Sequence, residues 1–162
     1  MYKIKYRKPE EMKDSGVEWI GMVPLEWEVK HFKRCIKVNS GKEIIDDHQM
    51  IEKNVNVYGS GGIFKQTSKH LFNKESVLFG RKGTIGKPLF VNEKFWTIDT
   101  MYYTEFAEKT FLPKLLYYML LFYPWSLITT QTALPSIVGT DIENTKIIVP
   151  HLAEQQKITN FL

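Results

Sequence analysis

Two short apolar segments, each running into a glycine-rich turn, constrain the fold of this chain more than any other feature. Val55–Tyr58 (VNVY) enters Gly59–Gly62, and Ser76–Phe79 (SVLF) enters the longer turn Gly80–Lys87. Six of the ten glycines lie within residues 59–87. Glycine adopts backbone conformations that other residues avoid, so this pattern predicts strands that end in tight turns.

The stretch that holds both turns is also basic. Residues 59–87 contain six lysines and arginines and one acid, Glu75, so the net charge of the stretch is +5, against +4 for the whole chain. Clustered positive charge attracts an anionic partner. A glycine-rich hairpin with a solvated basic face accounts for the same residues, and the stretch alone leaves both interpretations open.

The composition indicates a folded, intracellular type of protein. The chain has 162 residues, of which 43% are hydrophobic and 14% aromatic, enough for one domain with a buried core. Its single cysteine, Cys35, excludes an internal disulfide and is expected to be a small apolar side chain. Charges throughout the N-terminus and prolines within the longest uncharged run, Leu115–Thr140, argue against a signal peptide or a membrane span. We therefore expect a cytoplasmic location.

The remaining segments predict more strands and a few helices. Phe111–Tyr123 (FLPKLLYYMLLFY) predicts a helix with a proline in its first turn, and its apolar residues on nearly every face predict burial. Thr140 and Glu143 have the spacing of a capping box, which predicts a brief helical turn. His151–Leu162 reads as the start of an amphipathic helix. Further strands are predicted at Glu28–Val38 (with a short helix as the alternative), Leu89–Val91, Phe95–Glu105 and Lys146–Val149.

These elements predict an α/β (α+β) fold. We expect a mixed or antiparallel sheet, one buried helix, and a C-terminal helix that leaves the globule. The expected organisation is a loosely attached arm at residues 1–15, a domain at residues 16–149, and the start of a longer helix at residues 150–162.

Familiar catalytic patterns are missing from the sequence. No phosphate-binding loop is complete, and the dinucleotide fingerprint that begins at Gly59 fails at Phe64. The four histidines lack metal-ligand spacing, so we predict no metal site, no catalytic residue and no cofactor. An unrecognised metal-dependent nuclease that uses Asp46, Asp47 or Asp99 remains an alternative.

The turns and the polar segments beside them supply candidate nucleic-acid contacts. Arginine and lysine bind phosphates, and glutamine, serine and threonine can read base edges. The candidate phosphate contacts are Lys65, Lys69, Arg81, Lys82 and Lys87. The candidate base-reading residues are Ser60, Gln66, Thr67, Gln131 and Thr132. Gln131 and Thr132 belong to the polar, β-prone stretch Ser126–Ile137, where the exposed face of a strand explains them equally well.

The order of the motifs resembles the target recognition domain of a type I restriction–modification specificity subunit. The residues that carry the resemblance, from Met12 onward, are MKDSGVEWIG, VPLEWEVK, VYGSGGI, VLFGRKGTIGK, FWTIDTMYY and KIIVPHLAEQQKI. The resemblance implies a non-catalytic part that recognises double-stranded DNA and specifies one half of a bipartite target site. Because the sequence-reading residues of this family vary with the target, the contact residues above rest on chemistry and position alone.

The resemblance also implies partners. Specificity subunits usually carry two recognition domains joined by long helices, which recruit modification subunits and, through them, the restriction subunit. S-adenosylmethionine, ATP and magnesium would then belong to those partner subunits. The candidate partner helix offers Leu152, Ile158, Phe161 and Leu162. One domain and the first turns of one helix suggest an excised domain or a half-subunit, and a protein-interaction scaffold that uses Leu152–Leu162 is the alternative function.

Overall fold

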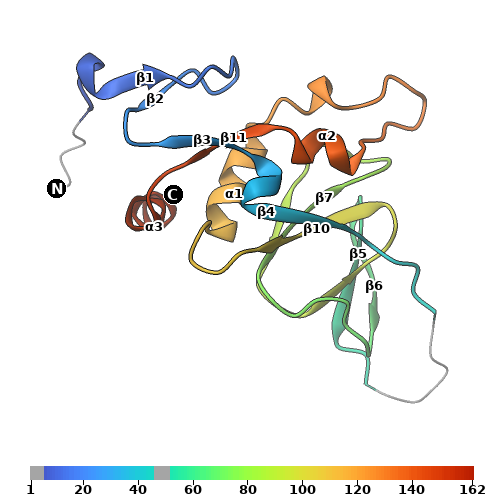
Figure 1. Ribbon diagram of the computed structural model, residues 1–162. Helices are drawn as coiled ribbons and strands as arrows, with labels where there is room; N and C mark the ends of the chain where they lie inside the picture. The colour runs from blue at the N-terminus through green and yellow to red at the C-terminus, as the bar shows by residue number, and fades with distance from the viewer. Residues whose placement is uncertain (1–5, 46–51) are drawn as a thin grey trace.

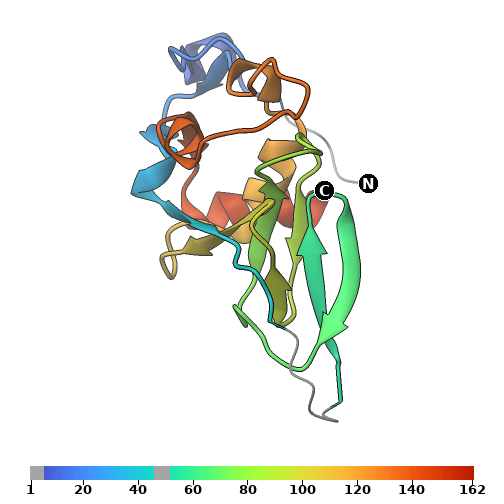
Figure 2. The same cartoon turned by 90° about the vertical axis from the view of Figure 1, so that its right-hand side faces the viewer.

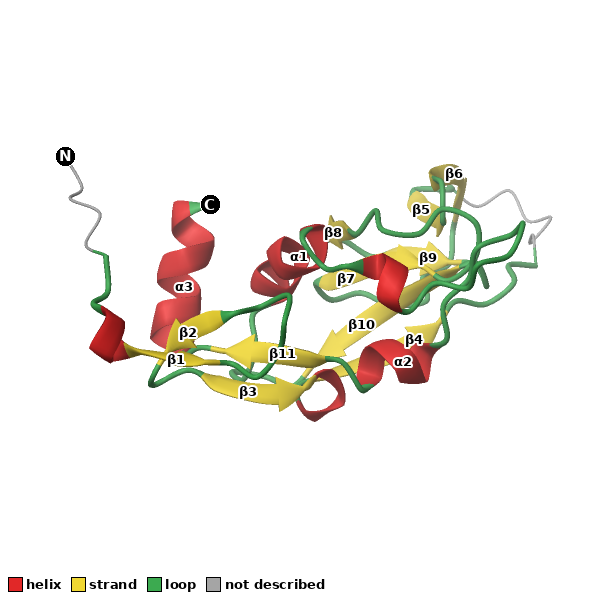
Figure 3. Ribbon diagram, turned by 90° about the horizontal axis from the view of Figure 1, so that it is seen from above, coloured by secondary structure: helices red, strands yellow, loops and turns green. Residues whose placement is uncertain are grey.

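The computed structural model describes residues 6–45 and 52–162 (Figure 1). Within these ranges the chain forms four small sheets and three α-helices, α1 (Pro113–Leu121), α2 (Gly139–Glu143) and α3 (Leu152–Phe161). Seen from above, the molecule is elongated, with α3 near one end and strands β5, β6 and β9 at the other (Figure 3). The predicted mixture of strands and few helices is confirmed.

The central sheet has four antiparallel strands in the order β4-β10-β7-β8. These are β4 (Ile36–Ser40), β10 (Met101–Phe106), β7 (Ser76–Gly80) and β8 (Leu89–Val91). Every residue of β7 is buried, because both faces of this strand are covered. Val77 and Phe79 pack in the core cluster that includes helix α1, whereas Leu78 faces the opposite cluster with Tyr58 and Phe95. Because successive side chains point to opposite faces of a strand, β7 contributes to both core clusters.

The second sheet holds the first glycine turn. Strands β5 (Val55–Gly59) and β6 (Gly62–Thr67) form an antiparallel hairpin, and β9 (Phe95–Thr97) lies parallel to β5. This hairpin stands beside the central sheet (Figure 2), with the second core cluster between the two sheets. The glycine turn is thus followed directly by a strand, because residues 62–67 complete the ladder with β5.

Two strands that were expected to be continuous are interrupted. Phe95–Glu105 forms β9 and β10, separated at residues 98–100 by a turn that the Met101 N–H closes onto the Ile98 carbonyl. Glu28–Val38 forms β3 (Glu28–His31), the 3-10 turn η2 (Phe32–Arg34) and the start of β4, so the strand and the short helix are both present. The turn η2 buries Phe32 completely, which gives a packing reason for the break.

The N-terminal residues are more ordered than an arm. Strand β1 (Met12–Asp14) pairs with β2 (Met22–Pro24), and β3 pairs with β11 (Lys146–Val149). A loosely attached arm is therefore wrong for residues 12–14, because their backbone groups bond to β2. The 3-10 turn η1 (Pro9–Glu11) precedes β1, and residues 1–5 lie outside the described residues.

The helices follow the predictions with two corrections. Helix α1 buries Leu115, Leu116 and Leu120, but Phe122 just after it is 81% exposed, so burial on nearly every face is wrong at this end. Helix α2 starts at Gly139 without a side-chain cap, because Thr140 lies inside the helix and not at its N-cap. The expected capping box is therefore absent from α2, although the helical turn itself forms.

Candidate nucleic-acid interface

The first glycine turn is held against two other segments by Ser60. Ser60 and Gly61 are the two residues that connect β5 to β6. The Ser60 N–H donates to the Thr100 hydroxyl at 3.3 Å, and the Thr84 N–H donates to the Ser60 hydroxyl at 3.4 Å. The side chain of Ser60 thus faces the second turn and helps to hold that turn in place.

The second turn needs glycine because its backbone is tightly folded. A Cβ on Gly80 would lie 2.0 Å from the Thr84 carbonyl oxygen, inside any permitted contact. Gly83 has a φ of +86°, which L side chains rarely adopt, and a Cβ there would lie 3.1 Å from the Ser60 hydroxyl. These glycines set the path of the turn, and Arg81, Lys82 and Lys87 supply its charges.

A third loop, residues 129–136, is attached to the second turn by backbone hydrogen bonds. The Gly83 N–H donates to the Pro135 carbonyl and the Ile137 N–H donates to the Arg81 carbonyl, both at 2.9 Å. Lys82 and Ser136 form an isolated β-bridge between these bonds. The stretch Ser126–Ile137, predicted to be β-prone, therefore contributes one bridge and otherwise forms a loop, which η3 (Trp125–Leu127) introduces.

The third loop is also braced internally. The Thr130 N–H donates to the Ser136 carbonyl at 2.9 Å, and the Ser136 N–H donates back to the Thr130 hydroxyl at 3.0 Å. The Thr132 hydroxyl donates to the Leu134 carbonyl at 2.8 Å. Five consecutive residues, 130–134, are exposed at the loop's tip. Gln131 and Thr132, both predicted to read bases, are among them.

The connection between β9 and β10 contacts both turns, a role that was not predicted from the sequence, where Asp99 was named only as a nuclease candidate. In this connection the Thr100 carbonyl accepts the Arg81 N–H at 2.8 Å, and the Thr100 hydroxyl accepts the Ser60 N–H at 3.3 Å. The Asp99 carbonyl accepts the Arg81 guanidinium at 3.3 Å, and that guanidinium also lies 5.8 Å from the centre of the Tyr102 ring. The polar Asp99-Thr100 pair inside an aromatic run is the signal that could have revealed it.

Residues 59–62, 80–87 and 129–136 are called the three-loop surface below. It combines Ser60, Arg81, Lys82 and Lys87 with Gln131 and Thr132, so six of the ten predicted contact residues belong to it. The other four, Lys65, Gln66, Thr67 and Lys69, lie on or just after β6. The arrangement places basic side chains and amide or hydroxyl groups on one set of braced loops, as a nucleic-acid contact surface requires.

The residues on β6 differ in how well they suit contact with DNA. Gln66 is exposed, but its amide donates to the Asn56 side-chain oxygen at 3.2 Å. Thr67 is only 7% exposed, and its hydroxyl accepts the Lys69 N–H at 3.4 Å. The expectation that Thr67 reads a base is therefore wrong, because β6 places its side chain against the sheet. Lys65 is half-buried and Lys69 is exposed.

In residues 6–45 and 52–162, no group of three His, Cys, Asp or Glu side chains could hold a metal ion. Asp99 is exposed, and Asp46 and Asp47 lie outside the described residues. Burial raises the pKa of the Cys35 thiol, and this side chain packs in the core as expected.

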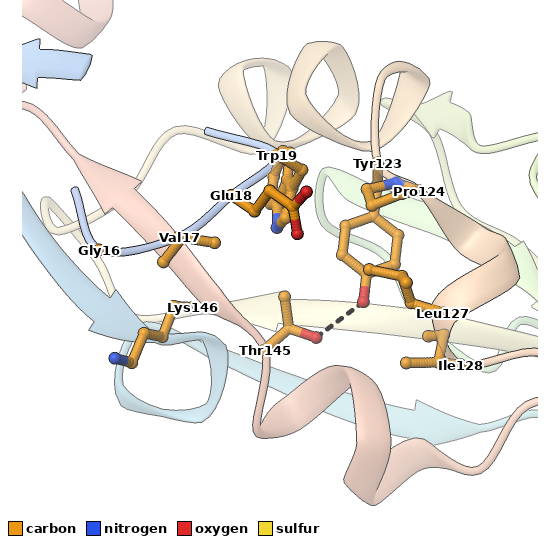
Figure 4. Close-up of a pocket in the computed structure, with 10 residues that line it drawn as sticks. All are labelled: Gly16, Val17, Glu18, Trp19, Tyr123, Pro124, Leu127, Ile128, Thr145 and Lys146. Atoms are coloured by element: carbon orange, nitrogen blue, oxygen red, sulfur yellow. Dashed lines mark hydrogen bonds between the residues drawn. The ribbon is translucent and has the colours of Figure 1, made fainter. Parts of the chain in front are cut away.

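A cavity of about 720 Å³ lies between the N-terminal segment and the end of α1 (Figure 4). Trp19 and Tyr123 meet edge to face there, with ring centres 5.3 Å apart. The Tyr123 hydroxyl is hydrogen-bonded to the Thr145 hydroxyl at 2.9 Å, and burial raises the pKa of this phenol. The cavity shares no residue with the three-loop surface, and its aromatic contacts attach the N-terminal segment to the core.

Helix α3 presents most of its predicted partner residues to solvent. Leu152, Phe161 and Leu162 are exposed, whereas Ile158 is half-buried against the core. Its buried face is polar and centres on Gln155. No helix in residues 6–45 and 52–162 is long and apolar enough to cross a membrane.

Solved structures share the fold at low sequence identity. The S subunit of a type I restriction-modification system from M. genitalium matches with a TM-score of 0.72 and 16% identity, over 83% of this chain and 37% of that one. The HsdS subunit from Thermoanaerobacter tengcongensis matches with a TM-score of 0.67 and 15% identity, over 94% of this chain and 39% of that one. The chain thus spans about two fifths of the length of these structures.

Comparison with curated proteins gave no match, whereas a family model covers most of the chain. The matched model is described as the type I restriction modification DNA specificity domain, and it covers residues 24–162. This range includes both glycine turns, the third loop and helix α3. The chain therefore belongs to the type I restriction modification DNA specificity domain family, in agreement with the resemblance of its motifs.

Proposed function

We propose that this chain recognises a specific sequence of double-stranded DNA through the three-loop surface. The observation that carries the proposal is the convergence of three loops from distant parts of the chain, joined by the Ser60–Thr84 and Gly83–Pro135 hydrogen bonds. Membership of a DNA specificity family supports it independently. A braced surface with basic and polar side chains can hold the phosphates while reading base edges.

The candidate contact residues divide into three roles. Arg81, Lys82 and Lys87 bind phosphates, with Lys65 and Lys69 extending the contact along the β5–β6 hairpin. Gln131 and Thr132 read bases because they are exposed at the tip of the third loop, and Gln66 is a further reader on β6. Ser60 positions the second turn and does not itself reach a base. Thr67 has no contact role.

The role in the larger enzyme extends this proposal. The domain at residues 16–149, with β1 attached to it, specifies one half of a bipartite site. Residues 150–162 begin a spacer helix whose exposed Leu152, Phe161 and Leu162 contact further helices. The chain itself is non-catalytic and acts in the cytoplasm with modification subunits and, through them, the restriction subunit. S-adenosylmethionine, ATP and magnesium belong to those partners.

Selection from a library of random duplexes tests this function. The full 162-residue chain is immobilised, and bound duplexes are amplified and sequenced over several rounds at moderate salt. Enrichment of one short motif supports the proposal. Retention of duplexes without any enriched motif contradicts specific recognition, and no retention at all favours the alternative of a protein-interaction scaffold. Cleavage of the library in the presence of magnesium would establish the nuclease alternative.

A further inference from the structure

A large apolar side chain, that of Leu134, stands exposed at the tip of the third loop. Leu134 is 61% exposed, and it follows the exposed residues Gln131, Thr132 and Ala133. The backbone at this leucine is held in place by two hydrogen bonds. The Thr132 hydroxyl donates to the Leu134 carbonyl at 2.8 Å, and the next carbonyl, that of Pro135, accepts the Gly83 N–H at 2.9 Å.

The bracing fixes Leu134 beside the basic tip of the second turn. Lys82 bridges to Ser136, two residues further along, and the Arg81 carbonyl accepts the Ile137 N–H. A basic turn therefore lies next to an exposed leucine whose backbone is held in place. The major groove of DNA offers one apolar group for such a side chain, the C5-methyl of thymine.

We propose that Leu134 reads a thymine by packing against its C5-methyl group, an inference that rests on the proposed DNA recognition. Its neighbours Gln131 and Thr132 supply hydrogen bonds to base edges in the same groove, while Lys82 holds the adjacent phosphates. Leu134 is thus a specificity-determining residue that hydrogen-bonding chemistry alone does not reveal.

Replacement of thymine by deoxyuridine tests the contact, because the exchange removes only the methyl group. Each thymine of the selected half-site is exchanged singly, and the dissociation constant is measured for the wild-type chain and for Leu134→Ala. At one position the wild type should bind the uracil duplex about fourfold more weakly, as expected for one buried methyl. Leu134→Ala should bind the thymine and uracil duplexes equally.

A matched control is Leu127→Ala. Leu127 is 71% exposed on the same segment of chain, but it lines the cavity beside Tyr123 and not the three-loop surface. This variant should keep the sensitivity to uracil. The inference is overturned if no thymine is sensitive in the wild type, if Leu134→Ala keeps the sensitivity, or if the selected half-site contains no thymine. In each of these results duplex binding itself persists, whereas loss of all specific binding would refute the proposed function.

Discussion

Replacing Gln155 by leucine should destabilise the whole domain, because this buried polar side chain joins α3 to the start of α1. Its Oε1 atom accepts the Leu112 N–H at 2.9 Å, and its Nε2 group donates to the Pro150 and Thr110 carbonyls at 2.9 and 3.1 Å. The side chain is completely buried. Leucine keeps the helix propensity and most of the volume but makes none of these bonds.

The size of the effect follows from the groups left without a partner. The bond to Pro150 is buried, so its orphaned carbonyl should cost about 1–3 kcal/mol, and the two partly buried bonds should each contribute about 0.5–1.5 kcal/mol. After allowance for the apolar gain of leucine, the expected loss is about 3 kcal/mol. With a urea slope of about 1–3 kcal/mol per molar, the unfolding midpoint should fall by about 1–3 M.

Urea unfolding followed by tryptophan fluorescence and circular dichroism measures this loss. Gln156→Leu is the matched control, because Gln156 is the neighbouring exposed glutamine and its side-chain amide donates to the Asn160 side chain within the same helix, at 2.9 Å. The control should change stability by less than about 0.5 kcal/mol. If both variants unfold at the same urea concentration, the hydrogen bonds of Gln155 do not stabilise the contact between α3 and the start of α1, and the prediction is wrong.

Two further predictions concern the turn and the N-terminal segment. Gly80→Ala should lower the unfolding free energy by about 2 kcal/mol or more, because the new Cβ would lie 2.0 Å from a backbone oxygen. Gly61→Ala is the control and should leave the urea midpoint unchanged, because a Cβ at Gly61 has no neighbouring atom within 4 Å. The hydrogen bond from Arg7 lowers the pKa of Glu26. The pair therefore stabilises the fold fully at a pH above 4.5, the ordinary pKa of glutamate, and this stabilisation is lost as the pH falls through the lowered pKa. Thermal midpoints measured across this acidic range should therefore fall less steeply for Glu26→Gln than for the wild type, and parallel profiles would show that the pair contributes nothing.

Local patterns in the sequence predicted most of the regular structure. The strands that enter the glycine turns and helix α1 are visible because apolar runs, glycine and proline act on their immediate neighbours. The chain order of these pieces also identified the family. The break at residues 98–100 was missed because its hydrogen bonds reach Ser60 and Arg81, and such distant pairs leave no local pattern.

The contact surface was only partly predictable for the same reason. The third loop reaches the second turn through the backbone of Pro135 and Gly83, and backbone groups carry no sequence signal. Thr67 was misassigned because composition does not tell which face of β6 a residue occupies. In α3 the fully buried residues are Gln155 and Thr159, which hydropathy does not single out, because a polar side chain is buried where it satisfies backbone groups.

The salt dependence of DNA binding tests the central claim most directly. The dissociation constant for the selected duplex is measured from low to moderate salt for the wild type, for Arg81→Ala with Lys82→Ala, and for Lys33→Ala with Arg34→Ala. The control pair has the same charge and lies towards the opposite end of the β4–β10 ladder, where Ile36 pairs with Phe106. We expect weaker binding and a salt slope reduced by about one to two for the first pair alone. Unchanged affinity and slope in that variant would show that the second turn does not contact DNA.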